Sequence, residues 1–165
     1  MRYLLLTGLF ALLAACGDAQ KTAELEADTL DTTRAACPEA DEDGNVLIAP
    51  GLSARIMHKG YGRRAVSGDH ADVHTTLWLY DDTADGGRGT EIWTSGGTDP
   101  FQFQLDAGQV IEGWDLGVAC MRLGETRELR IAPELGYGAR GKPPVPPNAT
   151  LLFEIELVRL ESPAE

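Results

Sequence analysis

The chain has 165 residues, a formal net charge of -12 and a charged fraction of 24%. This acidity argues against nucleic acid as a partner, because phosphate backbones are bound by basic surfaces. The length suits one folded domain with flanking segments.

The first residues have the composition of an export signal. Arg2 precedes an apolar stretch over residues 4–13, too short to span a bilayer as a helix, which needs about 20 residues. The next letters complete LAAC, which ends at Cys16 and resembles a bacterial lipobox. That resemblance implies a lipoprotein signal peptide over residues 1–15, cleavage before Cys16, and lipidation of Cys16. The alternative is an ordinary signal peptide with an unmodified cysteine. We expect a lipid-anchored protein of the cell envelope, at the outer membrane, facing the periplasm or the cell surface.

Residues 16–45 are rich in Asp, Glu, Ala and Thr and nearly free of aromatic side chains. Such a segment buries too little apolar surface to offset the entropy of ordering, so we interpret it as an acidic flexible tether. Cys37 and Cys120 could pair in an oxidising compartment. The sequence leaves this open, because it does not give the distance between their Cα atoms. Their spacing matches no metal-binding motif.

The domain is expected over residues 46–161, with a short tail at 162–165. Val73, Thr75, Leu77 and Leu79 alternate with more polar neighbours, a period of two that is typical of a strand with one buried face. Similar runs predict strands at residues 52–58, 71–80, 91–94, 100–105, 126–131 and 151–160.

One segment has helical rather than strand periodicity. Ile111, Trp114, Val118 and Met121 are spaced three, four and three apart, which places them on one face of a helix, and Gly124 follows as a stop signal. Several strands and one helix predict an α+β domain, a twisted antiparallel β-sheet wrapped around one central helix. Such an arrangement leaves a cleft between helix and sheet.

The sequence lacks the motifs of hydrolases and metalloenzymes. It has no Gly-x-Ser-x-Gly, no His-Glu-x-x-His and no phosphate-binding loop. His58, His70 and His74 have no matching ligand spacing, so we predict no metal site and no cofactor.

Three stretches are more specific: GQVIEGWDLGV, GYGARG and PPNATLLF. Together they resemble the FKBP-type peptidyl-prolyl cis-trans isomerases, and the resemblance covers most of residues 52–160. It implies a cleft that holds a substrate proline. Trp114 would form the floor, while the Tyr137 hydroxyl and the backbone N–H of Ile111 would donate to substrate carbonyls. The walls would be Phe101, Val110, Ile111 and Phe153.

A proline-rich loop, KPPVPP, follows the Tyr137 turn. Proline fixes φ and lacks an N–H, so this loop can overhang an apolar cleft at little ordering cost and without offering competing donors. The resemblance places Val145 at its tip, over the rim of the cleft.

The sequence departs from the family at the opposite wall. Thr75 stands where many members have Tyr, and Ile92 and Trp93 stand where they have Phe and Asp. Trp93 either refills the space left at Thr75 or is simply a large packing residue. These substitutions bear on the rate of catalysis and on macrolide binding, and leave the predicted fold unchanged.

Two functions therefore fit the sequence. The first is a prolyl isomerase that assists the folding of exported proteins. The second is a noncatalytic proline-binding or chaperone module with the same cleft. In either case we expect proline-containing unfolded or exported polypeptides as partners, a membrane reached through the lipid anchor, and a monomer.

Overall fold

A computed structural model describes residues 37–97 and 99–163. The predicted signal peptide and Cys16, with its predicted lipid, lie outside these residues. In chain order the elements are β1 (Asn45–Ala49), β2 (Leu52–His58), β3 (Tyr61–Arg64), β4 (His70–Tyr80), η1 (Asp85–Gly87), β5 (Arg88–Thr94), β6 (Phe101–Gln104), α1 (Glu112–Val118), β7 (Arg122–Leu123), β8 (Thr126–Ile131), η2 (Pro133–Leu135), η3 (Gly138–Arg140) and β9 (Leu151–Glu161).

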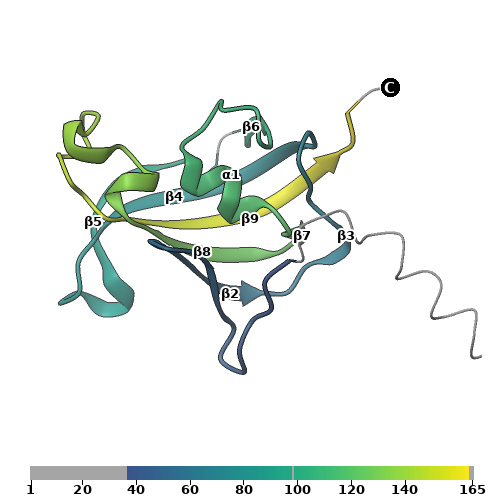
Figure 1. The fold of residues 1–165 in the computed structure, drawn as a ribbon, viewed down its shortest axis with the longest axis horizontal. Helices are drawn as coiled ribbons and strands as arrows, with labels where there is room; N and C mark the ends of the chain where they lie inside the picture. Colours follow the sequence, from purple (N-terminus) through teal and green to yellow (C-terminus); the bar gives the residue numbers. More distant parts are fainter. Residues whose placement is uncertain (1–36, 98, 164–165) are drawn as a thin grey trace, which may run out of the picture. The chain divides into compact units, whose positions relative to one another are not determined.

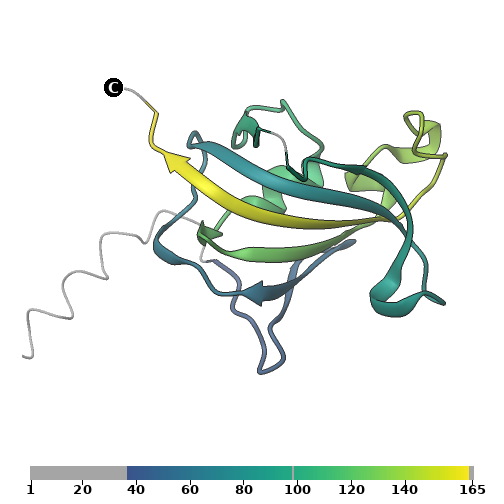
Figure 2. The ribbon, with the colours of Figure 1, turned by 180° about the vertical axis from the view of Figure 1, so that it is seen from behind.

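The main sheet has seven strands in the order β1-β2-β8-β9-β4-β5, and β6 also pairs with β4. All of its pairings are antiparallel. A separate small sheet joins β3 to β7. Figure 1 shows α1 lying across one face of the main sheet, over β4, β9 and β8, and Figure 2 shows these strands from the opposite side. This arrangement confirms the predicted α+β class.

The long strands follow the alternation in the sequence. In β4 the buried side chains include Val73, Thr75 and Leu77, while the residues between them are partly exposed. The limits of β2 and β8 coincide with the predicted ones, and β9 extends one residue beyond its prediction. Three strands, β1, β3 and β7, were not predicted. They are short, and every residue of β3 is exposed, so no buried face marks them in the sequence.

The helix is shorter than its periodicity predicted. The pattern ran from Ile111 to Met121 with a stop at Gly124, but α1 ends at Val118. Ala119 leaves the helical path with ψ 142°, and Cys120 follows with φ 67°, in the left-handed region. Met121 is fully buried beyond the helix end, and Gly124 lies between β7 and β8. The pattern therefore identified buried side chains correctly and the helix end wrongly.

Two glycines bring α1 close to β8. A Cβ atom placed at Gly117 would lie 2.4 Å from Leu129 Cδ1, and one at Gly113 would lie 2.5 Å from Ile131 Cγ2. Both distances are far below van der Waals contact, so the helix packs at this depth because these positions lack side chains. Trp114 lies between the two glycines, and this close packing therefore fixes its height above the sheet.

The C-terminal end of α1 is held by a buried ion pair. Arg127 Nη2 lies 2.5 Å from Glu125 Oε1, and both side chains are 6% exposed. Arg127 Nη1 also donates to the carbonyl of Gly117 at 2.8 Å. A guanidinium group at the last carbonyls of a helix satisfies acceptors that have no partner within the helix.

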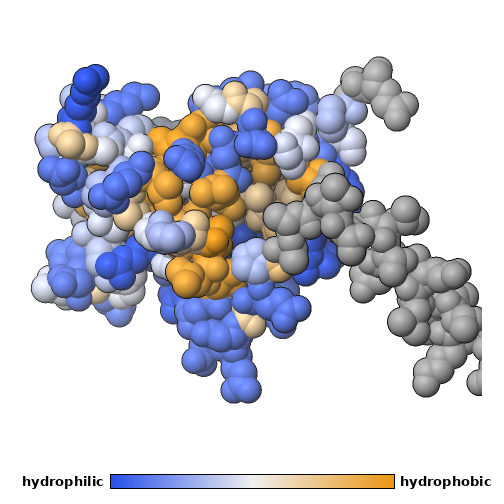
Figure 3. Space-filling model, in the orientation of Figure 1, coloured by the Kyte–Doolittle hydropathy of each residue, from blue (hydrophilic) through white to orange (hydrophobic). Residues whose placement is uncertain are grey.

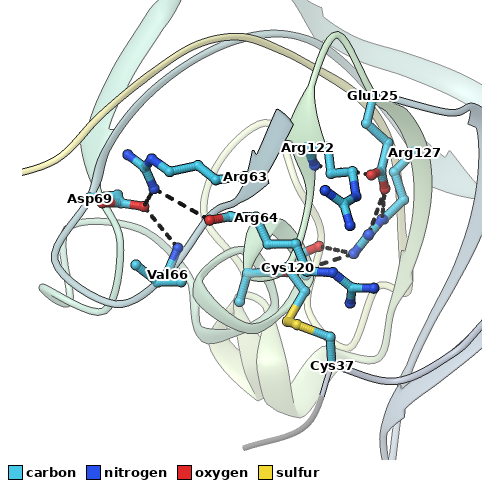
Figure 4. The surroundings of a disulfide bond; sticks show 11 residues. Cys37, Arg63, Arg64, Val66, Asp69, Cys120, Arg122, Glu125 and Arg127 are labelled. Carbon is cyan, nitrogen blue, oxygen red and sulfur yellow. Dashed lines mark hydrogen bonds and ion pairs between the residues drawn. A yellow bond between two sulfur atoms is a disulfide. The ribbon is translucent and has the colours of Figure 1, made fainter. Parts of the chain in front are cut away.

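A disulfide joins Cys37 to Cys120 beside this ion pair (Figure 4). The two Cα atoms are 5.7 Å apart, within the usual range of about 4.4–6.8 Å. The sequence had left this pairing open. The bond ties residue 37, within the expected tether, to the end of α1. Asp41 Oδ1 also accepts hydrogen bonds from the backbone N–H groups of Asp43 and Asn45, at 3.0 and 2.8 Å.

The apolar core lies between α1 and the sheet, with Val73, Val118, Leu129, Ile131 and Ile155 fully buried. On the face that carries α1, apolar surface gathers over the middle of the molecule between more hydrophilic ends (Figure 3). Within the described ranges, no helix has the length and apolar character needed to cross a bilayer.

Candidate active site

An apolar cleft opens between the start of α1, the sheet and the proline-rich loop at residues 142–147. Its volume is about 530 Å³. The lining residues are Leu77, Ile92, Trp93, Phe101, Gln109, Val110, Ile111, Trp114, Tyr137, Lys142, Pro143, Pro144, Val145 and Phe153. Nine of the ten predicted pocket residues are therefore brought together, from β5, β6, α1, β9 and the loops.

Trp114 lies at the centre of an aromatic cluster. Its ring centroid is 5.6 Å from those of Phe101 and Phe103 and 5.2 Å from that of Phe153. The contacts with Phe101 and Phe153 are edge-to-face, a favoured geometry for aromatic rings. The side chain is buried, and its indole Nε1 has no hydrogen-bond partner among the described residues. The indole is thus held by ring packing alone, as a rigid apolar surface at the base of the cleft.

Tyr137 is the neutral hydroxyl of the cleft. It precedes η3 and is half-buried. Burial raises the pKa of its phenol above the usual value near 10, because the charged phenolate is poorly solvated there. The hydroxyl therefore stays protonated at neutral pH and can donate a hydrogen bond.

Ile111 is the N-cap residue of α1, with extended backbone angles (φ -66°, ψ 148°). Its carbonyl accepts from the N–H of Trp114 at 2.8 Å. Its own N–H has no acceptor within the described part of the chain, as expected at the start of a helix. The residue therefore brings an unused backbone donor to a cleft wall.

The proline-rich loop is pinned at both ends of its tip. Lys142 and Val145 exchange two backbone hydrogen bonds, of 3.0 and 2.7 Å. Gly141 has φ 66°, and a Cβ there would lie 2.7 Å from the carbonyl oxygen of Val145. Only glycine fits this turn without a shift of the backbone. Val145 is 5% exposed and lines the cleft, so its side chain lies against the cleft wall.

The wall at β5 and β6 is partly open to solvent. Trp93 and Phe101 are 46% and 41% exposed, whereas Ile92 is half-buried. Thr75 differs from the expectation, because it does not line the cleft. Its side chain is buried, and its Oγ1 has no hydrogen-bond partner in the described residues. Leu77, two residues along the same face of β4, lines the cleft instead.

Two lining residues, Leu77 and Gln109, were missed by the sequence reasoning, and Lys142, Pro143 and Pro144 were included only as part of the loop expected to overhang the cleft. For Leu77 the signal was available, since the alternation in β4 places it on the same face as Thr75. The side chain of Gln109 is held in place by the backbone of β6, because its Oε1 accepts a hydrogen bond from the N–H of Gln104 at 3.0 Å.

The chemistry available in the cleft is limited. Its lining contains no carboxylate, thiol, imidazole or serine hydroxyl. Nor do the described residues contain a group of three or more His, Cys, Asp or Glu side chains that could hold a metal ion. An apolar cleft with two hydrogen-bond donors and a rigid aromatic base suits binding and conformational chemistry. The fold and site thus define an α+β domain with one apolar, ligand-sized cleft beside its helix.

Comparison with known proteins identifies the family. The model for FKBP-type peptidyl-prolyl cis-trans isomerases matches residues 62–158. FK506-binding protein 1 of Dictyostelium discoideum is 43% identical over 114 residues, which cover 66% of this chain and 96% of the relative. An FK506-binding protein of Neisseria meningitidis serogroup B is 41% identical over 112 residues, covering 67% and 96%. FK506-binding protein 1 of Gibberella zeae is 40% identical over 111 residues, covering 67% and 98%.

The chain therefore belongs to the FKBP-type peptidyl-prolyl cis-trans isomerases, an enzyme family. This confirms the resemblance carried by the three motifs. The roles assigned to individual site residues remain predictions, and the tests below address them.

Proposed function

We propose that the cleft above Trp114 binds the proline of an X–Pro sequence in exported polypeptides and accelerates rotation about the preceding peptide bond. The observation that carries this proposal is the buried indole, held edge-to-face by two phenylalanines at the base of a cleft whose lining has no carboxylate, thiol, imidazole or serine hydroxyl. A pyrrolidine ring is apolar and compact, and it would pack on this indole.

The proposed mechanism requires no covalent step. The barrier to rotation about a peptide bond, about 18–20 kcal/mol, arises from amide resonance. The twisted amide is less polar than either planar form. Transfer from water to an apolar cleft therefore costs the twisted form less free energy than it costs the planar forms, and this difference lowers the barrier. Only interactions that are stronger in the twisted state lower the barrier. Each tenfold gain in rate needs about 1.4 kcal/mol of such preference.

The two donors have distinct tasks in this mechanism. We assign the Tyr137 hydroxyl and the Ile111 N–H to carbonyl groups of the substrate backbone, on either side of the rotating bond. Fixing these carbonyls would allow the proline to turn while the flanking peptide is held still. The neutral state of Tyr137, which burial favours, is the state that can donate.

Variants of two site residues would test the proposal by NMR exchange spectroscopy on a short Ala-Leu-Pro-Phe peptide. Trp114→Leu should reduce kcat/KM by about tenfold or more, and Tyr137→Phe by a smaller factor. Trp78→Leu is the matched control, because Trp78 lies on β4 outside the cleft lining. Circular dichroism would check that each variant is folded.

Full rate acceleration by folded Trp114→Leu would contradict the proposal. Peptide binding by the unmodified chain with no acceleration would instead support the noncatalytic binding module.

The proposed lipid anchor in the cell envelope is tested separately. Mass spectrometry of the mature N-terminus should find a lipidated Cys16 as the first residue. An unmodified Cys16 would exclude the lipid anchor and leave the isomerase mechanism unaffected.

A further inference from the structure

The charge around the cleft is unevenly distributed. The chain as a whole carries a formal net charge of -12. Among the described residues that line the cleft, Lys142 is the only one with a formal charge at neutral pH. The phenol of Tyr137, beside it, is neutral. A peptide in the cleft would therefore meet a single formal charge in the described lining, an ammonium group on a chain whose net charge is strongly negative.

Lys142 is held at a defined point of the rim. Its backbone exchanges two hydrogen bonds with Val145, and Gly141 makes the tight turn before it. Its ammonium nitrogen lies 5.8 Å from the centroid of the Tyr137 ring, the residue to which we assign a substrate carbonyl. No carboxylate within the described ranges forms an ion pair with it. Its charge is thus not neutralised by a neighbour and lies beside the proposed position of the substrate backbone.

The opposite end of the cleft has different electrostatics. Trp93 and Phe101 also border a second depression, which contains Asp72, Asp99 and Arg159. Arg159 lies 3.6 Å from Asp72 and 2.5 Å from Glu161, so its charge is already paired with two carboxylates. A peptide that extends past Trp93 would meet charges of both signs there, whereas Lys142 carries the single formal charge of the cleft lining.

We propose that Lys142 makes the cleft selective for peptides with Glu or Asp beside the proline, on the side that faces the proline-rich loop. This inference rests on the proposed function of the cleft. A carboxylate about 5 Å from an exposed ammonium in water gains enough to give a preference of about three- to fivefold over a neutral residue. The preference should shrink with added salt, because both groups reach solvent.

The test uses the full-length chain and two peptide series, Ala-Xaa-Pro-Phe and Ala-Leu-Pro-Xaa, with Xaa as Glu, Gln or Lys. Isomerisation is followed by NMR exchange, without a coupling protease, at 20 and 500 mM salt. Binding of the same peptides is measured in parallel by tryptophan fluorescence. We expect kcat/KM and affinity to decrease in the order Glu, Gln, Lys in at least one series at low salt.

Charge reversal gives the sharpest comparison. Lys142→Glu should reverse the order to Lys, Gln, Glu, and Lys142→Gln should make the three peptides nearly equal. Arg140→Gln is the matched control, since it removes an exposed cation of η3, two residues before Lys142, that does not line the cleft. It should leave the order unchanged.

The outcomes separate this inference from the proposed function. Equal values for the three peptides in both series, or the same order in Lys142→Glu, would overturn the role of Lys142 while leaving the isomerase intact. A charge-dependent affinity with no acceleration of any peptide would refute turnover at this cleft and still support the selectivity. Failure to bind any peptide would overturn both.

Discussion

Gly117→Ala tests the link between helix packing and the cleft. Gly117 lies in α1, where alanine favours the helix by about 1 kcal/mol relative to glycine. If packing were unimportant, the substitution would stabilise the domain. The structure predicts the opposite sign, because the new Cβ would lie 2.4 Å from Leu129 Cδ1 and 3.1 Å from Leu129 Cδ2.

The magnitude follows from how far the helix must move. Ordinary contact begins at 3.4 Å, so the helix and Leu129 must separate by about 1 Å. Leu129 is fully buried in β8 and cannot turn aside into solvent. Overpacking of this kind costs about 1–3 kcal/mol, so the net loss after the gain of about 1 kcal/mol in helix propensity is about 0–2 kcal/mol. Trp114 moves with the helix, and kcat/KM should fall by about tenfold, since misplacement by about 1 Å is costly in a preorganised site.

Urea unfolding gives the stability, and NMR exchange on Ala-Leu-Pro-Phe gives the activity. Leu116→Ala, a partly exposed position of the same helix, is the control and should cost well under 1 kcal/mol. Adding Leu129→Val to Gly117→Ala should recover part of the loss, because the pair shares one contact. A folded Gly117→Ala protein that is more stable than the parent would refute the close approach of α1 to β8.

Three further predictions concern other parts of the molecule. Replacing Cys37 and Cys120 by serine should lower the free energy of unfolding by about 4–5 kcal/mol in urea titrations, from the loop entropy of an 83-residue separation; a loss below about 1 kcal/mol would show that the bond adds little. Thr75→Val should raise stability by about 1 kcal/mol in the same titration without changing kcat/KM, because it removes a buried hydroxyl that lacks a partner; a loss of stability would indicate a hydrogen bond there. Burial raises the pKa of Tyr137 in the folded state. The stabilisation linked to this raised pKa is therefore complete below the pKa of the unfolded state and is lost as pH rises through the pKa of the folded state. Activity should accordingly persist beyond pH 10 before it falls, and Tyr137→Phe should lack this step; a fall centred below pH 10 in the parent would contradict the raised pKa.

The sequence was most informative where burial has a period. The alternation of Val73, Thr75 and Leu77 placed β4 correctly, because one face of this strand packs against the core. Such a pattern could not give the end of α1, because Met121 would be buried whether it lay within the helix or, as observed, just past its end. The backbone angles of Ala119 and Cys120 decide between these possibilities, and the periodicity of buried residues does not predict them.

The site shows the same division. Motifs placed Trp114, Tyr137 and Val145 around one cleft, because their spacing and turn residues are specific. Thr75 was assigned to the wall by position in the family pattern, yet its buried side chain does not line the cleft. Leu77, on the same face of β4, lines it instead. The Cys37–Cys120 bond depended on a Cα separation across 83 residues, which local sequence does not encode.

The position of the cleft follows from a mismatch in length. α1 has seven residues and rises about 10 Å, whereas β4 and β9 have eleven each and extend about 36 Å. The helix can therefore cover about a third of the sheet face along these strands. The extended ψ of Ala119 ends the helix on one side, and the extended backbone at Ile111 begins it on the other. Beyond Ile111 the apolar side chains of the sheet need another cover, and the Tyr137 turn and the proline-rich loop supply it only at the rim. The space left between them is the cleft, so its size depends on where α1 starts, and its depth on the two glycines that lower Trp114 onto the sheet.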